Sequence, residues 1–184
     1  MASLRSALLP ACDGLFLGGG FPETHMAALE ANAPMREAVA AFIERDGPVY
    51  AECGGLMYLC NSLTWKEKTR NMAGVIPVGV TMHAKPQGRG YVRLRETSAH
   101  PWPLSVDRRE VIPAHEFHYS ALADMPAGFE YAYRVERGFG LDGVHDGIVY
   151  RNLLASYAHR RDTRSHPWAR RFVEFVRACR SGSV

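Results

Sequence analysis

Cys53 is the residue in this sequence whose surroundings best suit covalent chemistry. It follows a short apolar run at 49–51, where we expect a strand, and two glycines come directly after it, where we expect a helix to begin. A sharp turn from strand to helix exposes a nucleophile, and small neighbours relieve the crowding around it. The amide dipoles at the start of a helix also favour the thiolate. The alternative is an inert, buried cysteine.

A thiol nucleophile needs a base, and the sequence contains eight histidines. His159 follows an expected strand at 153–157, so we expect it at the edge of the sheet where open α/β proteins bind ligands. His83, His115 and His118 match no zinc-ligand spacing, and we therefore expect no metal site. The other four are interpreted as residues of solvated loops or helices, at positions 25, 100, 145 and 166.

Residues 115–119 (HEFHY) read as a strand with two different faces. His115 and Phe117 would lie on one face, and Glu116 and His118 on the other. We expect one of the two histidines to face the site or a neighbouring domain, while the other packs inside. For His118, a substrate contact and a structural hydrogen bond both remain open.

Three glycines, Gly18 to Gly20, follow another expected strand at 14–17. The run lacks the spacing of a dinucleotide-binding loop, and no P-loop motif occurs in the sequence. The amides of Gly19 or Gly20, together with that of Gly54, can form an oxyanion hole beside the cysteine. The alternative is a tight turn without a catalytic role.

The elements that must position these residues follow a regular order early in the chain. Strand, glycine turn and helix occur twice, with helices expected at 34–46 and from 54 to about 63. This order is typical of a parallel sheet with helices on its faces. Farther on, turns separate apolar segments without a strong helix between them, which predicts an antiparallel extension. The later elements are expected at 73–80, 90–95, 111–119, 130–136, 147–150 and 153–157 as strands, and at 167–180 as the last helix.

The composition indicates one globular α/β domain over residues 1–184. Of these, 47% are apolar and 22% charged, which excludes a disordered chain. No uncharged apolar stretch is long enough to span a membrane, and a net charge of +3 does not call for nucleic acid. Seven arginines from position 160 onward indicate an arginine-rich surface helix or, alternatively, a contact for an acidic partner. Four cysteines without metal or disulfide spacing favour a reducing, cytoplasmic compartment.

Four segments, spread over nearly the whole chain, resemble the C-terminal glutamine amidotransferase domain of cobyrinic acid a,c-diamide synthases. They are LGGGFPE at 17–23, AECGGLMYL at 51–59, HEFHYS at 115–120 and LASYAH at 154–159. The resemblance implies a flavodoxin-like, class I (triad-type) amidotransferase fold, a mixed sheet with helices on both faces. It implies Cys53 as the nucleophile and His159 as the base. The further roles implied are oxyanion-hole amides at Gly19 and Gly54, and a position near the glutamine site or a domain contact for Glu116 and His118.

In that family the cysteine forms a γ-glutamyl thioester with glutamine and releases ammonia. An N-terminal synthetase domain, where ATP and Mg are expected, then uses the ammonia to amidate the a and c acetate side chains of a tetrapyrrole such as cobyrinic or hydrogenobyrinic acid. The resemblance implies glutamine as the substrate of this chain, no cofactor of its own and a synthetase domain as its partner. Residues 145–152 (HDGIVYRN) also look like those of relatives that act on sirohydrochlorin or sirohaem.

The sequence departs from the family pattern in three ways. Arg161 stands where many triad amidotransferases have a glutamate, two residues after the histidine, so the resemblance implies a Cys–His dyad whose imidazole another group orients. By comparison with that pattern, we expect the synthetase domain and the first strand, helix and strand of the amidotransferase domain to lie outside this sequence. We therefore expect an N-terminally truncated fragment or a diverged short protein. The strand at 14–17 would then form a sheet edge, covered by residues 1–12 or by a second copy in a homodimer.

Two other functions stay open. A catalytically silent binding module would keep the fold without the chemistry; Arg161 favours it, whereas the intact Cys53 and His159 do not. Another cysteine hydrolase, such as a peptidase, would use the same turn, and a preference for glutamine over peptides would separate the two.

Overall fold

The main sheet of the protein contains eight strands in the order β1-β2-β11-β10-β9-β6-β7-β12. The computed structural model describes residues 8–103, 110–123 and 125–182. The strands are β1 (Leu15–Leu17), β2 (Val49–Glu52), β6 (Gly88–Glu96), β7 (Val111–His118), β9 (Glu130–Arg137), β10 (His145–Tyr150), β11 (Leu153–Ser156) and β12 (His159–Arg160). β1, β2 and β11 run parallel, and the other neighbours pair antiparallel. The predicted mixed sheet with an antiparallel extension is confirmed.

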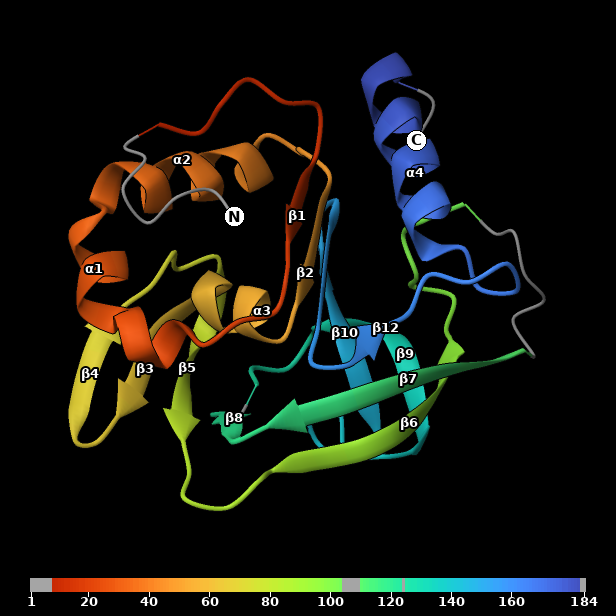
Figure 1. The fold of residues 1–184 in the computed structure, drawn as a ribbon. Coiled ribbons are helices and arrows are strands. Elements are labelled where there is room, and N and C mark those ends of the chain that lie inside the picture. The colour runs from red at the N-terminus through yellow and green to blue at the C-terminus, as the bar shows by residue number, and fades with distance from the viewer. Residues whose placement is uncertain (1–7, 104–109, 124, 183–184) are drawn as a thin grey trace.

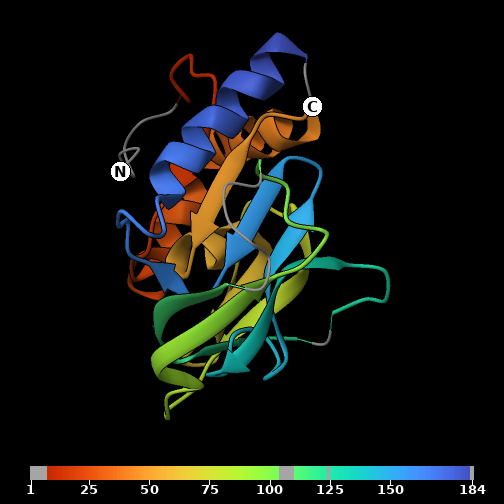
Figure 2. The same ribbon diagram turned by 90° about the vertical axis from the view of Figure 1, so that its right-hand side faces the viewer.

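Helices cover both faces of this sheet, as predicted. α2 (Ala33–Glu44) and the short α3 (Gly54–Leu59) lie on one face, and α4 (Trp168–Ser181) lies on the other (Figure 1). Figure 2 shows α4 running alongside β2. A 3-10 turn, η1 (Pro22–His25), and the helix α1 (Met26–Ala31) connect β1 to α2. No helix among the described residues has the length and apolar character needed to cross a membrane.

A second sheet of four strands, in the order β4-β3-β5-β8, departs from the sequence-based expectation. It consists of β3 (Cys60–Trp65), β4 (Lys68–Asn71), β5 (Ile76–Met82) and β8 (Ser120–Leu122). The helix expected to continue to about residue 63 ends at Leu59, because the backbone becomes extended at Cys60. Cys60 and Leu63 are fully buried on a strand, so their apolar spacing did not distinguish the two structures. The strand expected at 73–80 also belongs to this second sheet, not to the extension of the first.

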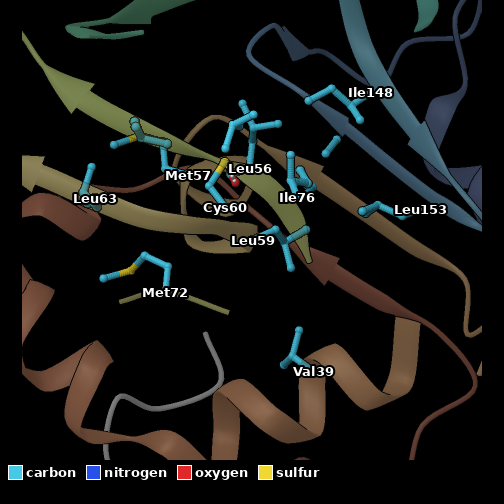
Figure 3. Packing of buried hydrophobic residues seen from close by; sticks show 14 of the residues in the cluster. Val39, Leu56, Met57, Leu59, Cys60, Leu63, Met72, Ile76, Ile148 and Leu153 are labelled. Carbon is cyan, nitrogen blue, oxygen red and sulfur yellow. Dashed lines mark hydrogen bonds between the residues drawn. The ribbon is translucent and has the colours of Figure 1, made fainter. Parts of the chain in front are cut away.

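Two apolar clusters hold the layers together. The first fills the space between the main sheet, α2, α3 and the second sheet; Figure 3 shows Val39 of α2 with Leu59 of α3 and Ile76 of β5. The second joins the main sheet to α4 through Phe172 and Phe175. β2 contributes to both clusters, because its side chains alternate between the two faces. All four of its residues are buried, as expected for a strand inside a parallel sheet.

Three side chains that we expected at the surface are buried. Arg171 is 1% exposed and forms a two-point ion pair with Glu96, with Nη2 and Oε2 3.0 Å apart. Arg160 donates a hydrogen bond to the hydroxyl of Tyr133, 2.8 Å away, and the ring of His100 lies 3.1 Å from the same hydroxyl. The interpretation as solvated residues is wrong here, because each of these side chains has a buried polar partner that offsets the loss of water.

β1 is an edge strand that, among the described residues, pairs with β2 alone. Residues 1–7, part of the segment expected to cover this edge, lie outside the described residues. Leu9 packs against the first apolar cluster, and residues 9–12 line a hollow together with α2. A homodimer through the β1 edge stays a prediction.

Truncation of Phe175 tests the packing of α4. Phe175 is fully buried, so Phe175→Ala should lower the free energy of unfolding by about 3–5 kcal/mol through the lost burial and the cavity left behind. Val173→Ala, on the same helix, is the control, because Val173 is 46% exposed; its effect should stay within about 0.5 kcal/mol. Urea unfolding followed by circular dichroism measures both. Equal losses would contradict the placement of α4 on the sheet.

Candidate active site

Cys53 occupies a strained turn between β2 and α3. Its φ of 46° and ψ of −101° are values that a residue with a side chain rarely adopts. Two hydrogen bonds hold the turn. The amide of Cys53 donates to the carbonyl of Ser156 at the end of β11, at 2.8 Å, and the carbonyl of Cys53 accepts from the amide of Met57 at 3.0 Å. The strand–turn–helix setting expected for this cysteine is therefore present.

The glycine turn at 18–20 lies directly against the turn at Cys53. A Cβ atom on Gly54 would lie 2.7 Å from the carbonyl oxygen of Gly20, and one on Gly55 would lie 2.1 Å from the carbonyl oxygen of Leu17. Both separations are far shorter than a van der Waals contact. Only glycine at positions 54 and 55 lets the two turns approach this closely.

The His159 side chain, from a third segment, lies beside the two turns at Cys53 and at 18–20. It is the first residue of β12, and its imidazole lies over Gly19, where a Cβ atom would be 2.5 Å from the ring Cε1. The imidazole also interacts with the Cys53 side chain, which is the largest cause of its raised pKa. This interaction, followed by that with the carboxylate of Glu52, raises the pKa of His159 to about 10. The structure thus brings together the residues predicted for nucleophile, base and oxyanion hole, namely Gly19, Gly20, Cys53, Gly54 and His159.

The buried carboxylate of Asp146 fixes the segment that leads to His159. Asp146 is fully buried and accepts hydrogen bonds from the Ser156 hydroxyl at 2.7 Å and from the amides of residues 157 and 158 at 2.9 and 3.0 Å. It also accepts one from the amide of Gly147. Burial raises the pKa of Asp146 despite these bonds. The turn between β11 and β12 is therefore held by one side chain of β10.

Glu52, which the sequence analysis did not single out, faces the imidazole. Its Oε2 lies 3.4 Å from Nδ1 of His159, whereas its Oε1 accepts hydrogen bonds from the Tyr50 hydroxyl at 2.5 Å and from the Arg160 amide at 3.1 Å. Glu52 is only 6% exposed. One signal in the sequence could have indicated Glu52: a glutamate that directly follows a buried apolar strand is itself expected to be buried. A buried charge requires polar partners, so such a glutamate is expected to contact other functional groups.

Glu116 and His118 lie on the inner face of β7, 2% and 3% exposed. Glu116 accepts hydrogen bonds from the two amides at 139–140, at 2.7 and 2.8 Å. Burial opposes ionisation, but the nearby His118 ring, 3.6 Å away, and these amides hold the pKa of Glu116 below its usual range. His118 bonds through Nδ1 to the Ser120 carbonyl at 2.8 Å and stacks on the Tyr157 ring, with centroids 3.9 Å apart. In the structure, the Glu116 side chain therefore connects β7 to residues 139–140, and the His118 side chain connects it to Ser120 and Tyr157.

The histidine of β7 that contacts the site is His115. The predicted alternation is confirmed, with His115 and Phe117 on the exposed face of the strand. The backbones of His115 and His159 pair between β7 and β12, and their rings stack with centroids 5.0 Å apart. Sequence reasoning missed this contact, because a pairing between distant strands leaves no local signal. Across the described parts of the chain, no three metal-binding side chains gather into a metal site.

Known proteins are similar to this chain in sequence and in fold. A family model described as the CobB/CobQ-like glutamine amidotransferase domain matches residues 1–164. The chain belongs to this family. Among curated relatives, a cobyrinate a,c-diamide synthase of Magnetococcus marinus is 47% identical over 169 residues, which are 92% of this chain and 36% of the relative. One of Archaeoglobus fulgidus is 41% identical over 172 residues, 94% of this chain and 37% of the relative. The chain thus spans just over a third of these relatives' length.

Solved structures agree on the fold of the amidotransferase. PurLQS from Thermotoga maritima matches with a TM-score of 0.66 at 14% identity, over 93% of this chain and 81% of that one. A structure described as a glutamine amidotransferase matches with a TM-score of 0.62 at 16% identity, over 89% of this chain and 79% of that one. The predicted flavodoxin-like amidotransferase fold is confirmed.

The charge state of His159 gives a pH-dependent prediction. Its pKa is raised from the ordinary 6.5 to about 10, so the imidazolium stabilises the folded amidotransferase fully below pH 6.5, and this contribution disappears as the pH rises through about 10. NMR titration of the His159 ring should give a midpoint near 10. Cys53→Ala should lower that midpoint, because it removes the largest cause of the shift. A wild-type midpoint near 6.5 would contradict the site geometry.

A methyl group at Gly19 tests the position of the imidazole. Gly19→Ala places a Cβ 2.5 Å from the His159 ring, which must move, so the rate of Cys53 alkylation by iodoacetamide at neutral pH should fall by about tenfold or more. Gly18→Ala is the matched control, because its Cβ would come no closer than 3.4 Å to another atom, the Phe16 ring. Peptide mass spectrometry after timed alkylation measures both. The same rate in the two variants would place the ring elsewhere.

Proposed function

We propose that this chain is the glutaminase unit of an ATP-dependent amidation enzyme, hydrolysing glutamine through Cys53. The observation that carries the proposal is the strained turn at Cys53, packed against the glycine turn over which the His159 imidazole lies. A silent binding module has no need to keep a cysteine in an unfavourable backbone conformation beside a histidine. Strain of this kind persists where a side chain must be presented for chemistry.

The reaction begins with the Cys53 thiolate attacking the side-chain amide carbon of glutamine. The tetrahedral intermediate collapses by breaking its C–N bond, and the His159 imidazolium gives its proton to the leaving ammonia. A γ-glutamyl thioester remains on the enzyme. The now neutral His159 then takes a proton from water, and the hydroxide cleaves the thioester to glutamate and the free thiolate. The balance is one glutamine and one water to one glutamate and one ammonia.

Backbone amides next to Cys53 are suited to stabilise the oxyanion of both tetrahedral intermediates. Gly54 is the first residue of α3, and an amide in the first turn has no carbonyl partner within its own helix. The backbone of Gly20 lies against Gly54, and Gly19 lies under the imidazole. We assign the oxyanion hole to the amide of Gly54 with that of Gly19 or Gly20.

The acceptor of the ammonia is proposed from the names of the relatives. Those at 41% and 47% identity are called cobyrinate a,c-diamide synthases, and this chain corresponds to about a third of their length. We propose that a synthetase unit, which binds ATP and Mg, uses the ammonia to amidate acetate side chains of a tetrapyrrole. Cobyrinic acid fits those names better than a sirohaem-type substrate. No P-loop occurs in this chain, so none of its residues is assigned to ATP.

We also propose that the protein works in the cytoplasm and that the edge strand β1 pairs with another segment. All four cysteines are free thiols, in keeping with a reducing cytoplasm. The exposed edge of β1 supports pairing with a second copy of the chain or with a preceding segment.

Replacing single cysteines tests the assignment of the nucleophile. Cys53→Ala should abolish both glutamine hydrolysis and covalent labelling by a glutamine-like electrophile such as 6-diazo-5-oxonorleucine, because no other thiol lies beside His159. Cys12→Ala is the surface control and Cys60→Ala the buried one; both should keep one label per chain. Intact-mass spectrometry counts the labels.

The control outcomes separate the alternatives. Labelling that persists in Cys53→Ala would refute Cys53 as the nucleophile. Hydrolysis of peptides in preference to glutamine would indicate another cysteine hydrolase. Amidation of a tetrapyrrole should require an added synthetase unit and ATP.

A further inference from the structure

We propose that Glu52 is the positioning residue for His159, so that this site works as a Cys–His–Glu triad whose acid immediately precedes the nucleophile in the sequence. The inference rests on the proposed function and goes beyond it, because it names the group that orients the base. Arg161 occupies the position two residues after the histidine, and its side chain is exposed.

The first support is the ring nitrogen of His159 that the Glu52 carboxylate faces. Oε2 of Glu52 lies 3.4 Å from Nδ1 of His159. In the proposed triad, Nδ1 is the ring nitrogen beside the carboxylate and keeps its proton, which leaves Nε2 for the Cys53 sulfur. This tautomer is the one that lets a histidine act on a thiol as base and then as acid.

The second support is that the Glu52 carboxylate is itself fixed. Its Oε1 accepts hydrogen bonds from the Tyr50 hydroxyl and from the Arg160 amide, so Oε2 remains for the imidazole. Tyr50 is fully buried and packs against the rings of Phe16 and Trp168, which hold its hydroxyl in place. A carboxylate 6% exposed and bonded on one oxygen by two donors has little freedom to turn away.

The third support is the backbone conformation of Cys53. Side chains of adjacent residues in a regular strand point to opposite faces, so Glu52 and Cys53 should not reach one imidazole. The positive φ of Cys53 ends this alternation directly after β2. The consecutive side chains of Glu52 and Cys53 then both lie beside His159. The strained turn therefore serves both the nucleophile and the acid.

Three titratable groups face His159 from the elements around it. Glu52 comes from β2, Cys53 from the turn, and His115 from β7, stacked on the ring. The carboxylate and the thiolate favour the imidazolium, whereas a charged His115 would oppose it. Removing the carboxylate should therefore release the imidazole proton at lower pH and reduce the population of the thiolate–imidazolium pair at neutral pH.

The test compares Glu52→Gln with the wild type. Glutamine keeps an oxygen that can accept from Tyr50 and Arg160 but lacks the negative charge. The midpoint of the His159 ring titration should fall by about one pH unit or more, and the neutral-pH rate of Cys53 alkylation by iodoacetamide should fall by about tenfold. Peptide mapping reads Cys53 separately from the exposed Cys12.

A matched control is Glu96→Gln. Glu96 is also 6% exposed and carries a buried ion pair with Arg171, but it has no contact with the His159 ring in the described structure. This variant should lose thermal stability while the His159 midpoint stays where it is in the wild type. A fall in the midpoint as large as that in Glu52→Gln would show that any loss of a buried carboxylate disturbs the site, and it would overturn the proposal.

A measurement on the wild type keeps the proposal falsifiable if Glu52→Gln does not fold. Nitrogen-15 NMR above the His159 midpoint should place the remaining ring proton on Nδ1, and a proton on Nε2 would refute the orientation by Glu52. A folded Glu52→Gln protein with a wild-type midpoint and alkylation profile would refute it as well. Because neither readout requires turnover, failure of glutamine hydrolysis counts against the proposed function and leaves the role of Glu52 to these measurements.

Discussion

Three segments that are distant in the sequence meet at a strained turn, and the close approach of their backbones governs the geometry of the site. Cys53 adopts a positive φ, and glycines at 54 and 55 let the turn at 18–20 come within contact distance. A side chain at either glycine would collide with the backbone of the opposite turn. The sheet then has to hold the turn in its unfavourable conformation, which it does through the hydrogen bond from the Cys53 amide to the end of β11.

Buried carboxylates hold the segments around this turn. Asp146 accepts hydrogen bonds from the amides of the β11–β12 turn, Glu52 accepts one from the Arg160 amide of β12, and Glu96 connects β6 to α4 through its ion pair with Arg171. Removing a charge from water is costly, and each of these groups is compensated by several donors or by a cation. Together they place His159, whose own strand contains only two residues.

The fold was predictable where local pattern and tertiary structure agree. The parallel strands, the helices on both faces and the antiparallel extension followed from glycine turns and apolar spacing. The second sheet did not, because apolar residues from 56 to 63 fit a helix as well as a buried strand. The choice was made at Cys60, where pairing with β4 and β5 compensates the backbone for the lost helical hydrogen bonds.

The sequence by itself determined the nucleophile candidate, the glycines and the histidine, because each stands in a local pattern of strand, turn and helix. It also determined which residues of β7 are buried, since a strand alternates with a period of two. Only the tertiary structure decided that Glu52 faces His159, that His115 stacks on it and that Arg171 is buried. The physical reason is the same in each case. These contacts depend on pairing between distant segments or on a backbone dihedral that breaks the alternation of side chains along a strand. Neither produces a periodic pattern of apolar and polar residues in the sequence.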